Sequence, residues 1–376
     1  MTIILKKATN NEKGIILVSH RELLLYKFFK YYKGAGYIEL KVNYYLLLHI
    51  GAYFRKFKVP DWVDFVYTTP SNVGLGRVEL SNKFINVCSR DVLPKQFKNK
   101  ELDRGIDCIY IANNSKNKRA REFFELVESA PELKFMLVLS YGLGTDRNKF
   151  DLNLVEDILA YQKKLGPKTN LVFIDAKHKP DGTYSINRTD ISNYLSMSKV
   201  YIHFCRREGE SRSIGEALSA GCYVYKHKEL IGGANDILHH KNSDSFIDVH
   251  ELGYKVAKLL SEGFEHSDIS DHYNIVRGEA LKLLSSNLKS MGMKNCDIEK
   301  LVSESDLSML LPGHIRPNFI SKGVNADIES KDDFLNFLNE VGIKYRYFSF
   351  HILWTSIKTV QFFKRLLFKV RYRVKI

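Results

Sequence analysis

Residues 200–238 read VYIHFCRREGESRSIGEALSAGCYVYKHKELIGGANDIL. The stretch opens with an apolar, β-branched run, which predicts a buried strand. A polar loop follows, then a helix over Ser213–Ala220 and a second strand over Cys222–Tyr225. The Gly232-Gly233 pair marks a turn beyond that strand. A strand, a helix and another strand in this order predict a parallel βαβ unit.

The same alternation continues toward the N-terminus. Strands are predicted at Cys108–Ala112, Lys134–Ser140 and Asn170–Asp175, and helices at Ala120–Ser129, Leu152–Leu165 and Ile191–Met197. Such a series predicts an α/β fold with a parallel sheet that binds ligands at the carboxyl ends of its strands. A strand at Ile15–Ser19 begins a smaller α/β block.

The loop after the first strand of the quoted stretch carries candidate binding groups. Gly209, Ser211 and Ser213 are small and keep the loop compact. Backbone N–H groups at the following helix N-terminus can then point at an anion. Arg212 adds a planar cation whose shape suits phosphate. The loop therefore predicts a phosphate-binding site.

Several motifs in this stretch occur together in a fixed order. They are Glu208-Gly209, Glu216-Ala217 eight residues later, Ala220-Gly221 before a strand, and Gly232-Gly233-Ala234-Asn235-Asp236-Ile237-Leu238. The chain resembles the sugar-nucleotide domain of family 4 glycosyltransferases, which are retaining enzymes of the GT-B fold. The resemblance covers about residues 106–248. It implies two Rossmann-like parallel-sheet domains facing a cleft.

An upstream loop extends the resemblance. The family places a Gly, an Arg and a Lys after the first strand of this domain, and here Ala112, Asn113 and Lys118 occupy those positions. Lys118 matches the family, whereas Asn113 replaces the arginine that grips the donor diphosphate. Arg119, Arg121 and Arg212 could take over that contact.

By resemblance, the site residues have distinct roles. Glu208 would lie near the donor sugar hydroxyls and the reacting face, and Glu216 would accept hydrogen bonds from the ribose. Lys118 and Arg212, with the amides of residues 209–213, would neutralise the leaving diphosphate. Gly232 and Gly233 would let the backbone approach the sugar closely.

The acceptor side is less well marked. The first predicted strand ends at Val18-Ser19-His20-Arg21, without the glycine of the family loop. His20 stands at a strand-to-helix turn and is the second catalytic candidate, its alternative being an ordinary loop histidine.

No metal or cofactor is expected. The five cysteines form no C-x-x-C pair, as a zinc site or disulfide framework would require, and no D-x-D triplet occurs. The donor would be a nucleotide-diphosphate sugar used without metal. Unclustered cysteines also favour a reducing compartment.

The net charge of +14 is concentrated near the C-terminus, where residues 345–376 hold eight Lys or Arg and no acid. Aromatic residues alternate with these cations, as in a helix lying on an anionic membrane. Packing against the first block or nucleic-acid binding would fit the same composition, but no nucleic-acid module accompanies the segment. With no secretory signal and no spanning run, we expect a cytoplasmic protein held on the inner membrane face.

The sequence predicts five segments. They are an acceptor-side α/β domain over 1–104, a sugar-nucleotide domain over 105–270, returning helices over 271–300, a linker over 301–330 and a basic amphipathic segment over 331–376. The expected function is sugar transfer with retention to a glycan or lipid-linked glycan, in the synthesis of a cell-surface polysaccharide such as lipopolysaccharide. A degenerate membrane-bound scaffold and a sugar-nucleotide epimerase remain alternatives.

Overall fold

The computed structural model describes residues 2–19, 41–50, 57–59, 63–71, 78–79, 84–88, 90–94, 96–142, 146–177, 185–303 and 325–326. His20 and the basic segment 345–376 lie outside the described residues, so their predicted roles stay predictions. The chain forms two compact units. Unit 1 comprises Met1–Ile50, Pro60–Val66 and Phe319–Ile376, and unit 2 comprises Gly51–Val59 and Tyr67–Asn318.

The first sheet has six strands in the order β14-β1-β2-β3-β5-β7. Their bounds are β1 Thr2–Lys6, β2 Gly14–Ser19, β3 Tyr44–His49, β5 Phe65–Thr68, β7 Phe84–Asn86 and β14 Asn325–Ala326. The central strands β2 and β3 are parallel and run in register from Gly14 opposite Tyr44 to Ser19 opposite His49. Strand β1 is antiparallel to both β2 and β14. Two further short strands, β4 Phe57–Lys58 and β6 Val78–Glu79, pair with each other.

The second sheet lies in unit 2, and its six strands are all parallel. They are β8 Ile106–Asn113, β9 Phe135–Ser140, β10 Leu171–Asp175, β11 Ser198–His203, β12 Tyr223–His227 and β13 Ser243–Phe246. Their order is β10-β9-β8-β11-β12-β13. Strands buried on both faces should be nearly continuous in apolar residues. FMLVL in β9 fits this rule, since Phe135–Leu139 are all buried.

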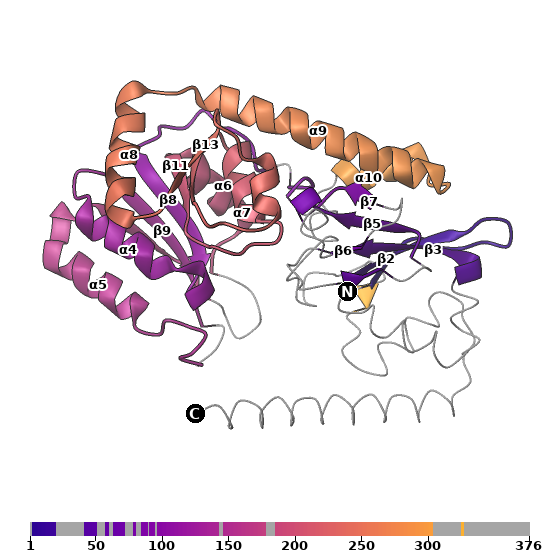
Figure 1. Ribbon diagram of the computed structural model, residues 1–376, viewed down its shortest axis with the longest axis horizontal. Coiled ribbons are helices and arrows are strands. Elements are labelled where there is room, and N and C mark those ends of the chain that lie inside the picture. The colour runs from indigo at the N-terminus through magenta and orange to yellow at the C-terminus, as the bar shows by residue number, and fades with distance from the viewer. Residues whose placement is uncertain are drawn as a thin grey trace. The chain divides into compact units, whose positions relative to one another are not determined.

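The connecting helices are α4 Ala120–Ser129, α5 Leu154–Leu165, α6 Arg188–Ser196, α7 Arg212–Ser219 and α8 Val249–Glu262. Figure 1 shows α4, α5 and α8 on one side of the second sheet and α6 and α7 on the other. Two helices follow, α9 His266–Ser290 and α10 Asn295–Ser303. None of the helices in the described part of the chain is long and apolar enough to span a membrane.

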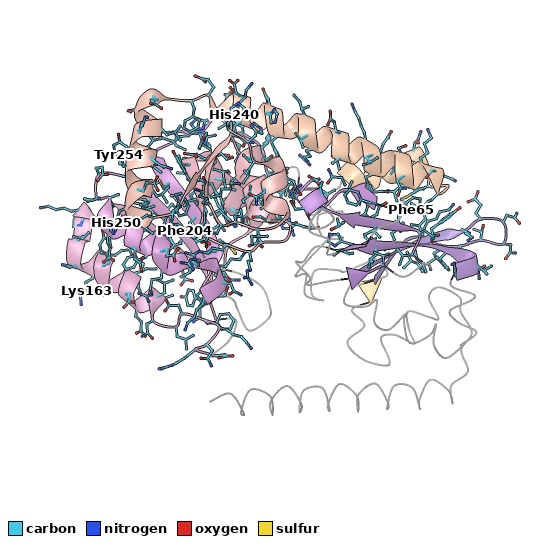
Figure 2. The ribbon with its side chains drawn as sticks, in the orientation of Figure 1. Phe65, Lys163, Phe204, His240, His250 and Tyr254 are labelled. Carbon is cyan, nitrogen blue, oxygen red and sulfur yellow. The ribbon has the colours of Figure 1, made fainter. Side chains whose placement is uncertain are left out.

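Aromatic side chains fill the core of unit 2. Phe204 is fully buried, and its ring lies 5.6 Å from that of Tyr110 and 5.1 Å from that of Phe246. Figure 2 shows Phe204 in the interior of this unit, whereas Tyr254 and His250 lie on the outer helix α8. Burial of such large apolar groups contributes roughly 1.5–3 kcal/mol each. This core fixes the strand ends that carry the candidate site.

The strand order of unit 2 contains one reversal. From β8 the chain winds outward through β9 to β10, then returns to place β11 on the other side of β8 and continues to β13. Ligands of doubly wound sheets bind where the order reverses, at the carboxyl ends of the strands. That point lies between β8 and β11, so the loops after Asn113 and His203 are the candidate ligand-binding loops.

The predicted α/β fold class with two parallel sheets is confirmed, with the antiparallel strand β1 added at one side of the first sheet. Residues 1–104, predicted to form one acceptor-side domain, contribute to both units: Gly51–Val59 and the residues from Tyr67 to 104 lie in unit 2. The reason is a set of tertiary bonds that tie Tyr67 and Arg90 to later residues of that unit. The segment 271–300 also belongs to unit 2, where it continues α9 from His266.

Candidate functional site

Lys118 and Glu208 meet at the reversal of the second sheet. Lys118 ends a short 3₁₀ turn, Lys116–Lys118, that follows β8. Glu208 lies in the loop after β11 and is separated from Lys118 by 90 residues. The Lys118 ammonium donates a hydrogen bond to Oε2 of Glu208 and forms an ion pair with it. The loop after β8 and the loop after β11 each carry a predicted site residue, and these two residues bind each other.

Burial and charge act on this pair in opposite directions. For Lys118, burial alone would lower the pKa, but the neighbouring Glu208 and Cys205, with the hydrogen bond to Glu208, together raise it. For Glu208, burial would raise the pKa, but Lys118 and the nearby His203 lower it. Both groups are thus held in their charged forms. The side chains keep 27% and 22% of their exposure, respectively, so a ligand can reach them.

The Glu208 loop is held by its backbone. Ile231 donates its N–H to the carbonyl of Arg206 over 2.9 Å, and Glu208 donates its own to the carbonyl of Ile231 over 3.0 Å. These bonds bring Gly232 against the loop, with φ +124°. A Cβ on Gly232 would lie 1.7 Å from the carbonyl oxygen of Glu208. Only glycine can occupy this position, because the backbone of Glu208 fills the space where a side chain would be.

Gly233 is equally confined. A Cβ there would lie 2.4 Å from Oγ1 of Thr69 and 2.6 Å from the carbonyl oxygen of Gly209. The resemblance assigned both glycines to sugar contact. The structure shows a second reason why these positions require glycine: their loop packs closely against residues 208–209.

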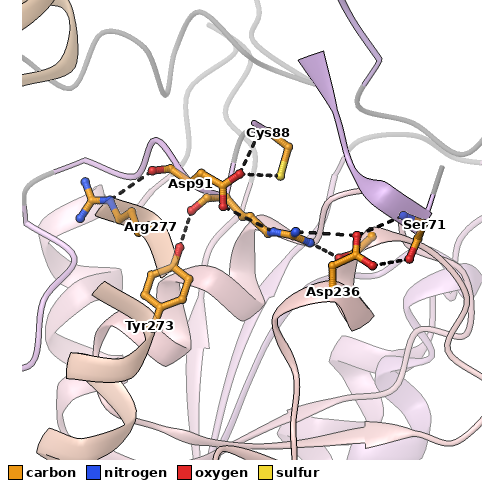
Figure 3. A network of polar contacts seen from close by, with 8 residues as sticks. Ser71, Cys88, Asp91, Asp236, Tyr273 and Arg277 are labelled. Carbon is orange, nitrogen blue, oxygen red and sulfur yellow. Dashed lines mark hydrogen bonds and ion pairs between the residues drawn. The ribbon is translucent and has the colours of Figure 1, made fainter. Parts of the chain in front are cut away.

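Arg90 binds the loop that contains Gly232 and Gly233, and the sequence did not predict this role. Its guanidinium, 2% exposed, donates to the carbonyl of Gly233 and forms an ion pair with Asp236 at 3.8 Å. Asp236 in turn accepts hydrogen bonds from the backbone and hydroxyl of Ser71. Figure 3 shows Asp236 and Ser71 at one end of this network.

The other end of the network reaches α9. Tyr273 donates its hydroxyl to the carbonyl of Arg90, and Arg277 donates to the carbonyl of Asp91 over 3.2 Å. Asp91 accepts from the backbone N–H of Cys88 over 2.8 Å (Figure 3). A buried arginine with partners this far apart in the chain has no sequence signature, so only the tertiary structure could identify Arg90.

Glu216 lies in α7 and has cationic neighbours. Its Oε1 is 3.1 Å from Nε of Arg212, one helical turn earlier. Arg188, at the start of α6, also faces it electrostatically. Burial raises the pKa of Glu216, while Arg212 and Arg188 pull it down without cancelling the rise. The site thus has a second acidic group, which is paired with Arg212 and lies within the electrostatic influence of Arg188. Arg188 was missed because nothing in its local sequence distinguishes it from a surface residue.

The small residues of the loop have structural tasks. Ser211 precedes α7 in a left-handed conformation with φ 31°, and its buried hydroxyl has no hydrogen-bond partner among the described residues. Ser213 accepts a hydrogen bond from Tyr201 over 2.9 Å, which ties α7 to β11. Gly209 packs against Gly233. The loop is therefore compact, as the sequence predicts.

Asn113 replaces the expected arginine, and its side chain serves the backbone. Its Oδ1 accepts the N–H of Ser115 over 3.0 Å, which turns the chain directly after β8. Of the three arginines that could substitute, Arg121 forms ion pairs with Asp151 at 2.6 Å and Asp157 at 2.9 Å, and Arg119 forms one with Glu122. Arg212 is the candidate that lies beside a predicted binding residue.

The chain was also compared with known proteins. No family model and no curated protein matches the chain. Among solved structures, it is similar to a glycosyltransferase from Rickettsia africae ESF-5, with 14% identity over 76% of this chain and 80% of that one, at a TM-score of 0.47.

Two other similar structures belong to longer proteins, of which the match covers only part. The pneumococcal O-GlcNAc transferase GtfA, in complex with UDP and GlcNAc, matches 72% of this chain at 14% identity with a TM-score of 0.47. TarM of S. aureus matches 67% at 13% identity with a TM-score of 0.44. The chain spans 60% of the length of GtfA and 51% of that of TarM. Function must therefore be argued from the site itself.

Proposed function

We propose that the protein is a glycosyltransferase of the GT-B type that transfers a sugar from a nucleotide-diphosphate donor. The observation that carries this proposal is the meeting of Lys118 and Glu208 at the strand-order reversal of unit 2, supported by the match of Glu208, Glu216 and Lys118 to the family motif. A cation from one loop and a carboxylate from the other flank the place where doubly wound sheets bind nucleotides.

The leaving group dictates what the cations do. When the bond between the sugar carbon and the phosphate oxygen breaks, negative charge grows on the diphosphate. Lys118 would leave Glu208 and donate to that phosphate, and the N-terminal amides of α7 would stabilise the same charge. Arg212, held beside Glu216, would complete the cationic side. Glu216 would accept the ribose hydroxyls.

Transfer would proceed with retention and without a metal. The acceptor hydroxyl oxygen forms the new bond to the sugar carbon, the phosphate leaves, and the hydroxyl proton passes to the leaving phosphate oxygen. Glu208, released by Lys118, would face the donor sugar hydroxyls and hold the sugar in place. The cations of the chain supply the charge stabilisation that a divalent ion gives in other transferases.

The acceptor would be a glycan or a lipid-linked glycan in cell-surface polysaccharide synthesis. The basic and aromatic composition of residues 345–376 supports this choice, because such a segment suits an anionic membrane surface on which a lipid-linked acceptor would lie. His20 would act on the acceptor side, and the protein would work at the cytoplasmic face.

Nucleotide binding is the first test. A thermal-shift screen of the full chain with UDP, GDP, ADP and CMP, in the presence of a chelator, should show one nucleoside diphosphate raising the Tm. At about a hundredfold excess over Kd the rise should be roughly 5 °C, because a ligand that binds only the folded state stabilises it by mass action. Glu216→Ala should lose the shift. Arg121→Ala is the matched control and should keep it, because Arg121 is tied to Asp151 and Asp157.

Catalysis is tested with the matching nucleotide sugar. Glu208→Gln should still bind the nucleotide but lose about 10²–10³ of the transfer rate. If no nucleoside diphosphate shifts the Tm, the chain is a scaffold rather than a transferase. Release of a free epimerised sugar without an acceptor would instead identify an epimerase.

A further inference from the structure

Three potential metal ligands come from six consecutive residues. His203 ends β11, Cys205 lies two residues on, and Glu208 follows after three more. Their ligand atoms, an imidazole nitrogen, the Cys205 Sγ and a carboxylate oxygen, all lie within 4.8 Å of one another. The spacing His-x-Cys-x-x-Glu differs from the paired cysteines of common zinc motifs, so the sequence alone did not predict a metal site.

His203 is the most unusual member of the cluster. It is 1% exposed, and neither of its ring nitrogens has a hydrogen-bond partner among the described residues. A neutral imidazole carries a proton on one ring nitrogen and offers the lone pair of the other to an ion. A buried polar group without a partner is costly, and a bound ion is one of the few explanations for it.

Cys205 supplies the second ligand atom. Cys205 is 2% exposed, and its Sγ lies 3.1 Å from the carbonyl oxygen of Arg207. A sulfur ligand beside an imidazole favours Zn²⁺ or a related borderline ion over Mg²⁺ or Ca²⁺, which prefer oxygen. The thiol would release its proton to solvent on binding.

Glu208 supplies the third ligand atom, and it is the ligand that solvent and ions can reach. Its side chain is 22% exposed, whereas the other two ligands are buried beneath it. The carboxylate is already paired with Lys118, so a metal ion would have to displace that ammonium. Three protein ligands leave one open position, as in tetrahedral zinc sites that bind water or a substrate group.

We propose that His203, Cys205 and Glu208 form a binding site for Zn²⁺ or a similar transition-metal ion, and that the ion competes with Lys118 for Glu208. The site is independent of the transferase proposal, because it needs no nucleotide. If the chain is a transferase, the metal would inhibit it by occupying Glu208.

Co²⁺ is a suitable probe because a cobalt ion bound by a thiolate gives an intense near-ultraviolet charge-transfer band. The full chain, freed of metal with a chelator and dialysed, should develop this band on titration and saturate at one equivalent. Zn²⁺ added afterwards should abolish it. Cys205→Ser should lose the band, and His203→Asn should bind Co²⁺ at least about tenfold more weakly.

Two variants make the test decisive. Cys296→Ser, which removes an exposed cysteine outside the cluster, should keep the band. Lys118→Met should bind the metal about tenfold more tightly, since a competing positive charge is removed. Such a gain cannot come from misfolding, whereas the losses in Cys205→Ser and His203→Asn could, so circular dichroism should accompany all four variants.

The proposal is overturned by a wild-type chain that shows no thiolate band, by a band that survives in Cys205→Ser, or by an unchanged affinity in Lys118→Met. None of these results bears on nucleotide binding, which the thermal-shift screen measures separately.

Discussion

Glu208 and Glu216 lie eight residues apart in one motif, yet they have different partners and opposite pKa shifts. Glu208 is paired across the reversal of the sheet with Lys118, and its pKa is lowered. Glu216 is paired within its own helix with Arg212, and its pKa is raised. One carboxylate depends on a partner from another loop, and the other on a partner one turn away.

The difference shows how two similar residues acquire different chemistry. The Glu208 pair exists only when β8 and β11 are adjacent, so it reports tertiary structure. The Arg212–Glu216 pair follows from helix periodicity, because residues four apart lie on one face.

The largest expected effect breaks the Glu208 loop itself. Gly232→Ala should destabilise the protein by about 3 kcal/mol, because the new Cβ would overlap the Glu208 carbonyl and φ would be unsuitable. Gly263→Ala is the matched control. Gly263 also has positive φ, +75°, but nothing lies within 4 Å of its Cβ position, so only the backbone strain remains and the cost should be about 1–2 kcal/mol. Denaturant unfolding measures both, and equal losses would show that Gly232 is not confined by Glu208.

A smaller effect separates the two ion pairs. A double-mutant cycle of Lys118→Met and Glu208→Gln should give a coupling free energy of about 1–2 kcal/mol, because this ion pair also carries a charge-assisted hydrogen bond. The cycle of Arg212→Met and Glu216→Gln should give about 0.5 kcal/mol, as for pairs along a helix. Chemical denaturation provides the four free energies of unfolding for each cycle. A larger coupling for the helical pair would contradict the interpretation of the two sites.

The smallest effect is in the pH dependence, where the two carboxylates should have opposite signs. Glu208 has a lowered pKa, so its stabilising contribution is present above the unfolded pKa and is lost as pH falls through the folded pKa. Glu216 has a raised pKa, so its contribution is present below the unfolded pKa and is lost as pH rises through the folded pKa.

The measurement is Tm against pH from about pH 3 to about pH 8, which covers both carboxyl titrations. Glu208→Gln should flatten the acid limb of the curve, whereas Glu216→Gln should remove a decline toward neutral pH. The same change of slope in both variants would mean that the two environments do not differ.

Much of unit 2 could be predicted from the sequence. Helix α4 was predicted with its observed bounds, Ala120–Ser129, because its apolar spacing is strong and Ala130-Pro131 ends it. Strand β9 was predicted to within one residue. Strand β1 was missed, because a short strand at the chain start with two lysines nearby gives a weak pattern. The membership of residues 67–104 in unit 2 has no local signal, because it rests on bonds to residues more than a hundred positions away.

The sequence by itself determined the alternation of strands and helices and the positions of Lys118, Glu208 and Glu216, because local periodicity and short motifs are properties of neighbouring residues. Only the tertiary structure decided which of these groups meet. It paired Lys118 with Glu208, buried His203 beside Cys205 with no hydrogen-bond partner in the described part of the chain, and bonded Arg90 to the carbonyl of Gly233. Such contacts join residues that are far apart in the sequence. Their energies depend on burial, and these residues become buried only when the helices pack on the sheet.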